Sequence, residues 1–155
     1  MILTRHPGAP HPIAVPGVVL RPPGVADAVA LGRLYFESYE PGVAAASEQD
    51  ALDDINLTFE DGYGVLTPTL SRLAWADGRL VGALLVVERA PWPDTPDCPF
   101  IIELFTARSH RRLGIARLLL NQCSDVTVAL RVQDDNASAL ALYYSAGFRS
   151  VAGSN

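Results

Sequence analysis

A single stretch in the second half of the chain, Phe100 to Cys123, constrains the fold more than any other. It begins with an apolar run typical of a buried strand and ends with an apolar periodic segment that favours a helix. The loop between them contains the pattern Arg111-x-x-Gly114-x-Ala116. Glycine lets the backbone approach a ligand closely, and the first N–H groups of a helix are unpaired. This strand-loop-helix pattern therefore predicts a site for an anion such as a phosphate.

Positive charge gathers in this loop although the chain as a whole is acidic. The net charge is −5 and the isoelectric point is near 5.0. General binding of nucleic acid needs a basic surface, so we expect no nucleic-acid partner. The basic side chains near the loop are Arg108, His110, Arg111, Arg112 and Arg117. Such a local cluster fits a small phosphate-bearing ligand better than a polyanion.

The composition indicates a globular protein without a metal or a disulfide framework. A chain of 155 residues, 49% of them hydrophobic, is long enough to bury a core. The two cysteines, Cys98 and Cys123, are too few for a zinc set, so we expect reduced thiols. No apolar run approaches the ~20 residues of a membrane span, and the first residues lack a secretory signal. We therefore expect a cytoplasmic protein with no membrane partner.

Residues 1–17 are predicted to form an irregular proline-rich arm, and residues 18–155 a single domain. Proline removes backbone donors, and the arm contains Pro7, Pro10, Pro12 and Pro16. In the domain the periodicity predicts strands and helices in the order β-α-α-β-β-β-α-β-α-β. The Asp77-Gly78 pair predicts a tight hairpin before a central strand that is apolar on both faces. This order predicts an α/β (α+β) fold, with a mixed central sheet and helices on both faces.

A second constellation follows downstream, in a segment predicted to be helical. Its pattern is Asn136-x-x-Ala139-x-x-x-Tyr143, closed by Gly147-Phe148. Taken alone, it is typical of a capped core helix in which Tyr143 is a half-buried aromatic. Both motifs together, in this order, resemble the GNAT superfamily of acyl-CoA-dependent N-acetyltransferases.

The resemblance covers nearly all of the predicted domain, from Val18 to about Val151. It is most specific in Leu104–Arg117 and Asn136–Phe148. It implies a GNAT-like fold in which acetyl-CoA, as co-substrate, lies between the strand Phe100–Thr106 and the strand Val126–Val132. The implied activity is transfer of an acetyl group to a primary amine.

The resemblance also implies which residues bind the cofactor. The pantetheine arm would pair with strand backbone like an added strand, the pyrophosphate would lie on loop N–H groups, and Asn136 would contact the cofactor arm. The implied cofactor-binding residues are Leu104, Phe105, Thr106, Arg111, Arg112, Leu113, Gly114, Ile115, Ala116, Arg117 and Asn136.

The implied general acid is Tyr143, which would protonate the leaving CoA thiolate. In the family's ribosomal-protein N-terminal acetyltransferases a glutamate serves as base, and Arg131 occupies that position here. Glu103 is the nearest carboxylate on the central strand, so it is the candidate base. The alternative is that Glu103 is a charge at a strand edge or forms an ion pair with Arg131, and a water relay could replace a side-chain base.

The end of the chain and the acceptor region carry two further expectations. The family usually adds a last strand after the position of Phe148, whereas this chain ends at Asn155. We therefore expect a short or missing C-terminal strand, with a sheet edge that is truncated or completed by a partner chain, as in a homodimer. In the family, the region that corresponds to Val25–Gly64 usually selects the acceptor. Its acidic residues would attract a cationic amine of a small molecule or peptide. Alternatively, they form a helix face that is exposed to solvent.

Two alternatives to an enzyme remain open from the sequence. The chain could be a non-catalytic module that binds or senses acyl-CoA, or a domain that binds another phosphate-bearing ligand such as a nucleotide. The presence of Tyr143 favours the enzyme. Measured turnover separates the enzyme from the module, and competition with acetyl-CoA separates both from a nucleotide-binding domain.

Overall fold

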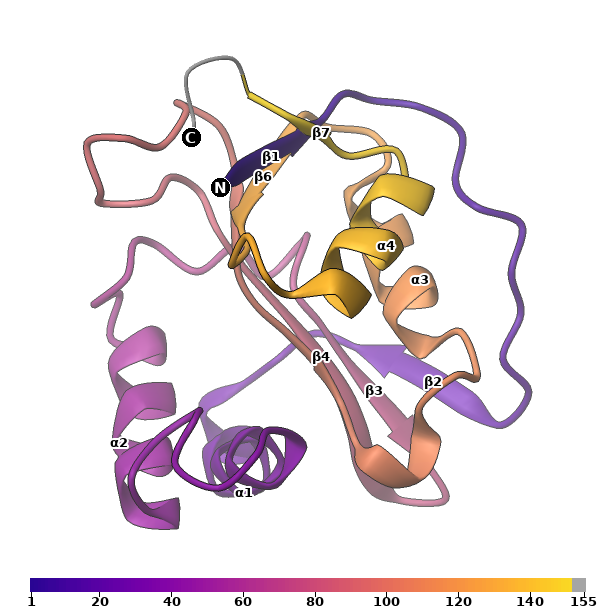
Figure 1. The fold of residues 1–155 in the computed structure, drawn as a ribbon. Helices are drawn as coiled ribbons and strands as arrows, with labels where there is room; N and C mark the ends of the chain where they lie inside the picture. The colour runs from indigo at the N-terminus through magenta and orange to yellow at the C-terminus, as the bar shows by residue number, and fades with distance from the viewer. Residues whose placement is uncertain (152–155) are drawn as a thin grey trace.

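The structure, a computed structural model, describes residues 1–151, and a mixed sheet runs through its centre (Figure 1). Within these residues the sheet has seven strands in the order β2-β3-β4-β5-β6-β1-β7. The strands are β1 (Ile2–Arg5), β2 (Val18–Arg21), β3 (Arg72–Ala76), β4 (Arg79–Val87), β5 (Phe100–Thr106), β6 (Val128–Arg131) and β7 (Arg149–Ser150). The helices are α1 (Ala28–Ser38), α2 (Glu48–Phe59), α3 (Ile115–Leu120) and α4 (Ala137–Ser145). The predicted mixed sheet and its order from Val18 onward are confirmed.

Two helical layers enclose the sheet, with α1 and α2 on one face and α3 and α4 on the other (Figure 1). Ser47 caps the start of α2, because its Oγ accepts a hydrogen bond from the Asp50 amide at 3.1 Å. α1 and α2 cross closely at Gly32, where a Cβ atom would come within 2.9 Å of the Leu52 Cα. Within residues 1–151, no helix is both long and apolar enough to cross a lipid bilayer.

The hairpin between β3 and β4 forms as predicted. Its turn residues, Asp77 and Gly78, have φ of 51° and 75°, which the favoured two-residue hairpin turn requires. The strand that follows is buried on both faces from Val81 to Val87. β4 is therefore the central strand that its apolar run indicates.

Residues 2–5 form strand β1, where the sequence predicts an irregular arm. β1 runs antiparallel to β6, with Leu3 opposite Leu130, and pairs on its other side with β7. Ile2 and Leu3 are only 3% and 0% exposed. The prediction is wrong for these residues because the prolines that prevent pairing begin only at Pro7, and the partner strand lies far away in the sequence. Residues 6–17 contain no helix or strand.

Strand β1 also changes the expectation about the sheet edge. β7 is short, as predicted, but it does not lie beside β6, because β1 lies between them. The edge of β6 is covered by β1 of the same chain, and the two-residue β7, the expected short C-terminal strand, ends the sheet beside β1.

β5 and β6 are parallel but separate soon after they meet. Their pairing comprises Phe100 with Ala129 and Ile101 with Leu130. On its other side β5 stays paired with β4 up to Thr106, with an irregularity in register after Leu85. The second half of β5 therefore has one edge that faces away from β4 and toward an opening in the sheet.

Candidate active site

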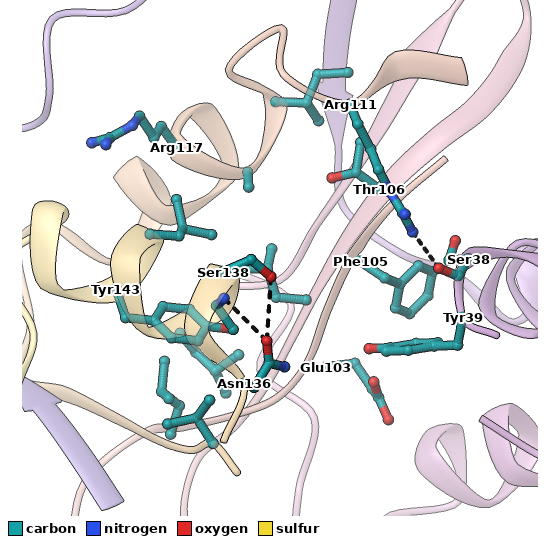
Figure 2. A pocket seen from close by; sticks show the side chains of 18 of the residues that line it. Ser38, Tyr39, Glu103, Phe105, Thr106, Arg111, Arg117, Asn136, Ser138 and Tyr143 are labelled. Atoms are coloured by element: carbon teal, nitrogen blue, oxygen red, sulfur yellow. Dashed lines mark hydrogen bonds between the residues drawn. The ribbon is translucent and has the colours of Figure 1, made fainter. Parts of the chain in front are cut away.

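The opening between β5 and β6 leads into a cleft with a volume of about 1020 Å³. Its walls come from β5, the loop before α3, the end of α1, the start of α3 and the inner side of α4 (Figure 2). All the residues that the sequence predicts for the site lie in its lining: Glu103, Leu104, Phe105, Thr106, Arg111, Arg112, Leu113, Gly114, Ile115, Ala116, Arg117, Asn136 and Tyr143. The fold thus brings both predicted motifs to one cleft.

The loop before α3 makes a tight turn into the helix. Arg112 and Gly114 both have positive φ, 63° and 94°. A Cβ atom at Gly114 would overlap the side chain of Ile13, which packs on the loop from the N-terminal segment. The first helical hydrogen bond runs from the Leu118 amide to the Gly114 carbonyl, at 3.0 Å. Glycine is therefore required here both by the backbone conformation and by the close neighbour.

Two arginines of this loop bind the end of α1 rather than pointing toward the turn. Arg111 donates a hydrogen bond to the Ser38 carbonyl (Figure 2). Arg108 donates to the Glu37 carbonyl at 3.1 Å and lies 3.5 Å from the Glu40 carboxylate. Cations at a helix C-terminus satisfy its unpaired carbonyl groups. These side chains tie α1 to the loop, so the anion site predicted at the loop depends on its backbone N–H groups.

Glu103 lines the cleft from β5, among side chains of α1 and α2. Burial, and to a smaller extent the negative charge of Asp54, raise the pKa of its carboxyl to about 8 against an opposing interaction with the Tyr35 hydroxyl. Asp54 lies on α2 and accepts a hydrogen bond from the Tyr63 hydroxyl. The carboxyl therefore exchanges its proton near neutral pH, the range in which a general base operates.

Tyr143 reaches the cleft from α4, and Tyr39 reaches it from the end of α1. Their hydroxyl groups point into the space between the two walls (Figure 2). Burial, and to a smaller extent the charge of Glu103, raise the pKa of Tyr143 to about 12. The Tyr143 ring packs edge-on against Phe148, with 5.6 Å between the ring centroids. Tyr143 therefore keeps its proton at neutral pH, as a proton donor must.

Arg131 does not pair with Glu103, so the ion pair considered as an alternative is absent from the structure. The Arg131 guanidinium instead binds the Asp94 carboxylate at 2.8 and 2.9 Å, in the loop before β5. This interaction lowers the pKa of Asp94. Glu103 is thereby left to interact with Tyr35 and Asp54.

Asn136, which the sequence predicts to contact a cofactor, also has a structural role. Its side-chain oxygen accepts from the Ala139 amide at 3.2 Å and from the Ser138 hydroxyl at 3.3 Å (Figure 2). It is therefore the N-cap of α4 and orients the helix that carries Tyr143.

Sequence reasoning did not find three side chains that shape this site. Tyr35 and Asp54 act on the Glu103 carboxyl, and Ile13 packs on the Gly114 turn. Tyr35 lies on the apolar stripe of α1 and Asp54 among other acidic residues of α2, so neither has a distinctive spacing. Their proximity to Glu103 depends on how α1 and α2 pack on the sheet.

The family of this chain follows from a comparison of its sequence with family models. Residues 29–148 match the model of the acetyltransferase (GNAT) family. The chain belongs to the GNAT family. This confirms the resemblance carried by the two motifs, and it agrees with the mixed sheet and its parallel β5–β6 pair.

Solved structures of GNAT proteins share the fold at low sequence identity. A GCN5-related N-acetyltransferase from Sphaerobacter thermophilus is 23% identical with a TM-score of 0.66, over 96% of this chain and 47% of its own. This chain thus spans about half the length of that protein. An aminoglycoside N-acetyltransferase in complex with CoA is 18% identical with a TM-score of 0.65, over 86% and 89% of the two chains. Diaminobutyrate acetyltransferase from Paenibacillus lautus, bound to L-2,4-diaminobutyric acid and coenzyme A, is 20% identical with a TM-score of 0.58, over 83% and 73%.

Proposed function

We propose that this GNAT protein transfers an acetyl group from acetyl-CoA to a primary amine of a small molecule or peptide. The observation that carries the proposal is the pairing of a proton donor and a proton acceptor at one cleft. Tyr143 and Glu103 both line it, and the charge of Glu103 acts on the pKa of Tyr143. Family membership and the CoA-bound structures of the same fold support the same reading.

The cleft has the features that acetyl-CoA needs. The edge of β5 near Leu104–Thr106 faces away from β4, so an extended pantetheine arm can pair with it as an added strand. The diphosphate then meets the turn at Gly114, where no side chain caps the start of α3 and the first backbone N–H groups of the helix can bind an anion. Arg112 and Arg117 add positive charge to the same end of the cleft.

The proposed reaction is a direct attack on the thioester. The amine nitrogen forms a bond to the carbonyl carbon, and the carbon–sulfur bond breaks. Glu103, in its ionised form, takes the proton that the amine loses, and Tyr143 gives its proton to the departing sulfur. The products are the acetylated amine and CoA, and solvent returns the enzyme groups to their starting protonation.

The acceptor enters from the side of α1 and α2 in this proposal. Glu103 faces that side, and Asp54 adds a second carboxylate near it. Two carboxyl groups close together attract a cationic amine by charge complementarity. The amine is thus drawn in as a cation and releases one proton to solvent, and the neutral amine that results loses a second proton to Glu103 as it attacks.

A thermal melt with acetyl-CoA tests the proposal first, with ATP as the control ligand. A ligand at ~100 times its dissociation constant adds ~2.7 kcal/mol to the free energy of unfolding. For a domain of this size, that raises the midpoint by roughly 5–10 °C. A rise with acetyl-CoA and none with ATP supports the site, and an amine screen that detects released thiol then tests turnover.

A pair of glycine variants controls for the loop. Gly114 and Gly78 both have positive φ, 94° and 75°, but a Cβ atom at Gly78 meets nothing within 4 Å. We expect Gly114→Ala to weaken acetyl-CoA binding at least ~10-fold and Gly78→Ala to leave it unchanged, since both carry similar backbone strain. Absence of any shift with acetyl-CoA in the wild type would refute the proposal. Binding without thiol release from any amine would favour the non-catalytic module.

A further inference from the structure

The N-terminal segment 6–15, which we call the crossing segment, runs along the outside of α3 on its way from β1 to β2 (Figure 1). It is fixed at His11, whose amide donates to Asn121 Oδ1 at 2.9 Å and whose carbonyl accepts from Asn121 Nδ2 at 2.9 Å. The Gly8 amide donates to the Ser124 carbonyl at 3.0 Å. Farther on, Ile13 packs on the Gly114 turn. The crossing segment therefore forms a wall beside the phosphate end of the cleft.

A second cavity of about 430 Å³ lies between the crossing segment, the second half of α3 and the end of α4. Its lining contains two arginines and two histidines, and no carboxylate among the described residues: Arg5, His6, Gly8, Ala9, His11, Arg117, Leu120, Asn121, Ser124, Ser145, Ala146 and Gly147. In a chain of net charge −5, this is a distinctly basic cavity. A space of this kind is suited to an anion.

The arginines of this cavity are held in place. Arg5 donates to the Leu120 carbonyl at 2.8 Å and to the Ala146 carbonyl at 3.3 Å, and its guanidinium lies 5.0 Å from the centre of the Phe148 ring. Arg117 donates to the Ser145 hydroxyl across the gap between α3 and α4. Positioned cations bind a phosphate at a smaller entropic cost than mobile ones.

The second cavity adjoins the main cleft. His11 and Arg117 line both of them, so these side chains stand where one space meets the other. A ligand with its diphosphate at the Gly114 turn would have its next group at this junction. CoA carries beyond its diphosphate a ribose with a 3′-phosphate, which is a dianion at neutral pH.

We propose that the second cavity receives the 3′-phosphate of CoA, with His11 and Arg117 as the residues that bind it. This inference rests on the proposed function, because it takes acetyl-CoA as the ligand of the main cleft. It assigns a role in cofactor selection to the crossing segment, which lies outside residues 29–148 that match the family model.

Calorimetric titration with acetyl-CoA and with acetyl-3′-dephospho-CoA tests this inference. The two ligands differ only in the phosphate concerned. We expect the wild type to bind acetyl-CoA roughly 10- to 100-fold more tightly, the range of one or two charge-assisted hydrogen bonds. In His11→Ala and in Arg117→Ala we expect this preference to fall to a few-fold, and in His11→Ala we expect binding of the dephospho ligand to stay within about threefold of the wild type.

Arg79→Ala is the control, because it removes the same charge from an exposed position that lines neither cavity. It should keep the full preference for acetyl-CoA. Equal binding of the two ligands by the wild type, or an unchanged preference in both variants, would overturn the inference and leave the proposed function standing. Failure of the wild type to bind either ligand would instead overturn the proposed function, and the inference with it.

Discussion

Individual side chains at this site carry properties that they would not have on the surface. Burial and the neighbouring Asp54 raise the pKa of Glu103 to about 8, so a carboxyl becomes a group that titrates near neutral pH. Burial and Glu103 raise the pKa of Tyr143 to about 12, which keeps the phenol protonated. In the proposed reaction the two shifts have opposite uses, one for accepting a proton and one for donating it.

Tyr143→Phe removes the proposed proton donor and leaves the ring against Phe148 in place. We expect it to lower the rate of amine acetylation roughly 10²–10⁴-fold, the usual contribution of a general acid, while acetyl-CoA binds normally. Steady-state kinetics with thiol detection measure the rate, and the melt measures binding. Tyr144→Phe is the matched control, because Tyr144 is 40% exposed and does not line the cleft. Equal rates in the two variants would remove Tyr143 from the mechanism.

Glu103→Gln should change how the rate depends on pH. The base acts when ionised, so kcat/KM of the wild type should rise with pH through about 8. In Glu103→Gln this limb should disappear, leaving only the titration of the acceptor amine. Asp54→Asn should move the limb to lower pH, because the charge of Asp54 raises the pKa of Glu103. Glu88→Gln, at an exposed residue just after β4, should behave as the wild type. A limb that stays in place in Glu103→Gln would assign it to another group.

At the scale of elements, the site depends on where β5 and β6 separate and on what holds the elements around them. Strand β1 extends the sheet on the far side of β6, and the N-cap at Asn136 starts the helix that carries Tyr143. Arg108 and Arg111 join the loop before α3 to the end of α1. The two walls of the cleft are thus linked by hydrogen bonds between distant elements.

Leu3→Ala tests whether β1 is an integral part of the sheet. Leu3 is 0% exposed, and the loss of a fully buried leucine costs about 2–5 kcal/mol of the free energy of unfolding. Urea denaturation measures this cost. Val19→Ala in the edge strand β2 is the control, because Val19 is 59% exposed and should cost no more than about 0.5 kcal/mol. Similar midpoints for the two variants would mean that residues 2–5 behave as an arm.

At the scale of the whole molecule, the buried carboxyl of Glu103 lowers stability at high pH. Its pKa is about 8 in the fold against an ordinary value of 4.5, so the native state keeps a proton that the unfolded state has lost between these values. Unfolding then releases a proton, and the free energy of unfolding falls as pH rises from about 5 to about 8. This one carboxyl thus makes the stability of the entire domain depend on pH.

Glu103→Gln should remove this part of the pH dependence. Relative to the wild type, we expect the variant to gain at least about 1 kcal/mol between roughly pH 5 and pH 9, because one unit of pKa corresponds to ~1.4 kcal/mol. Urea unfolding of both proteins at the two ends of this range measures the difference. Parallel curves would show that the carboxyl has an ordinary pKa in the fold.

The sequence by itself determined the features that depend on near neighbours. The Asp77-Gly78 turn, the Ser47 cap, the left-handed Gly114 and the buried run of β4 all follow from local backbone rules and periodicity. The two motifs indicated the family and the residues that line the cleft.

Only the tertiary structure decided what depends on contacts between distant segments. β1 finds its partner at the other end of the chain, and no pattern in four residues before a proline-rich segment encodes that pairing. Arg111 turns to α1 because the carbonyl of Ser38 lies within its reach in the fold. The pKa of Glu103 likewise depends on Asp54, which α2 brings to it. Burial and charge act through space, so they emerge only when the helices have packed on the sheet.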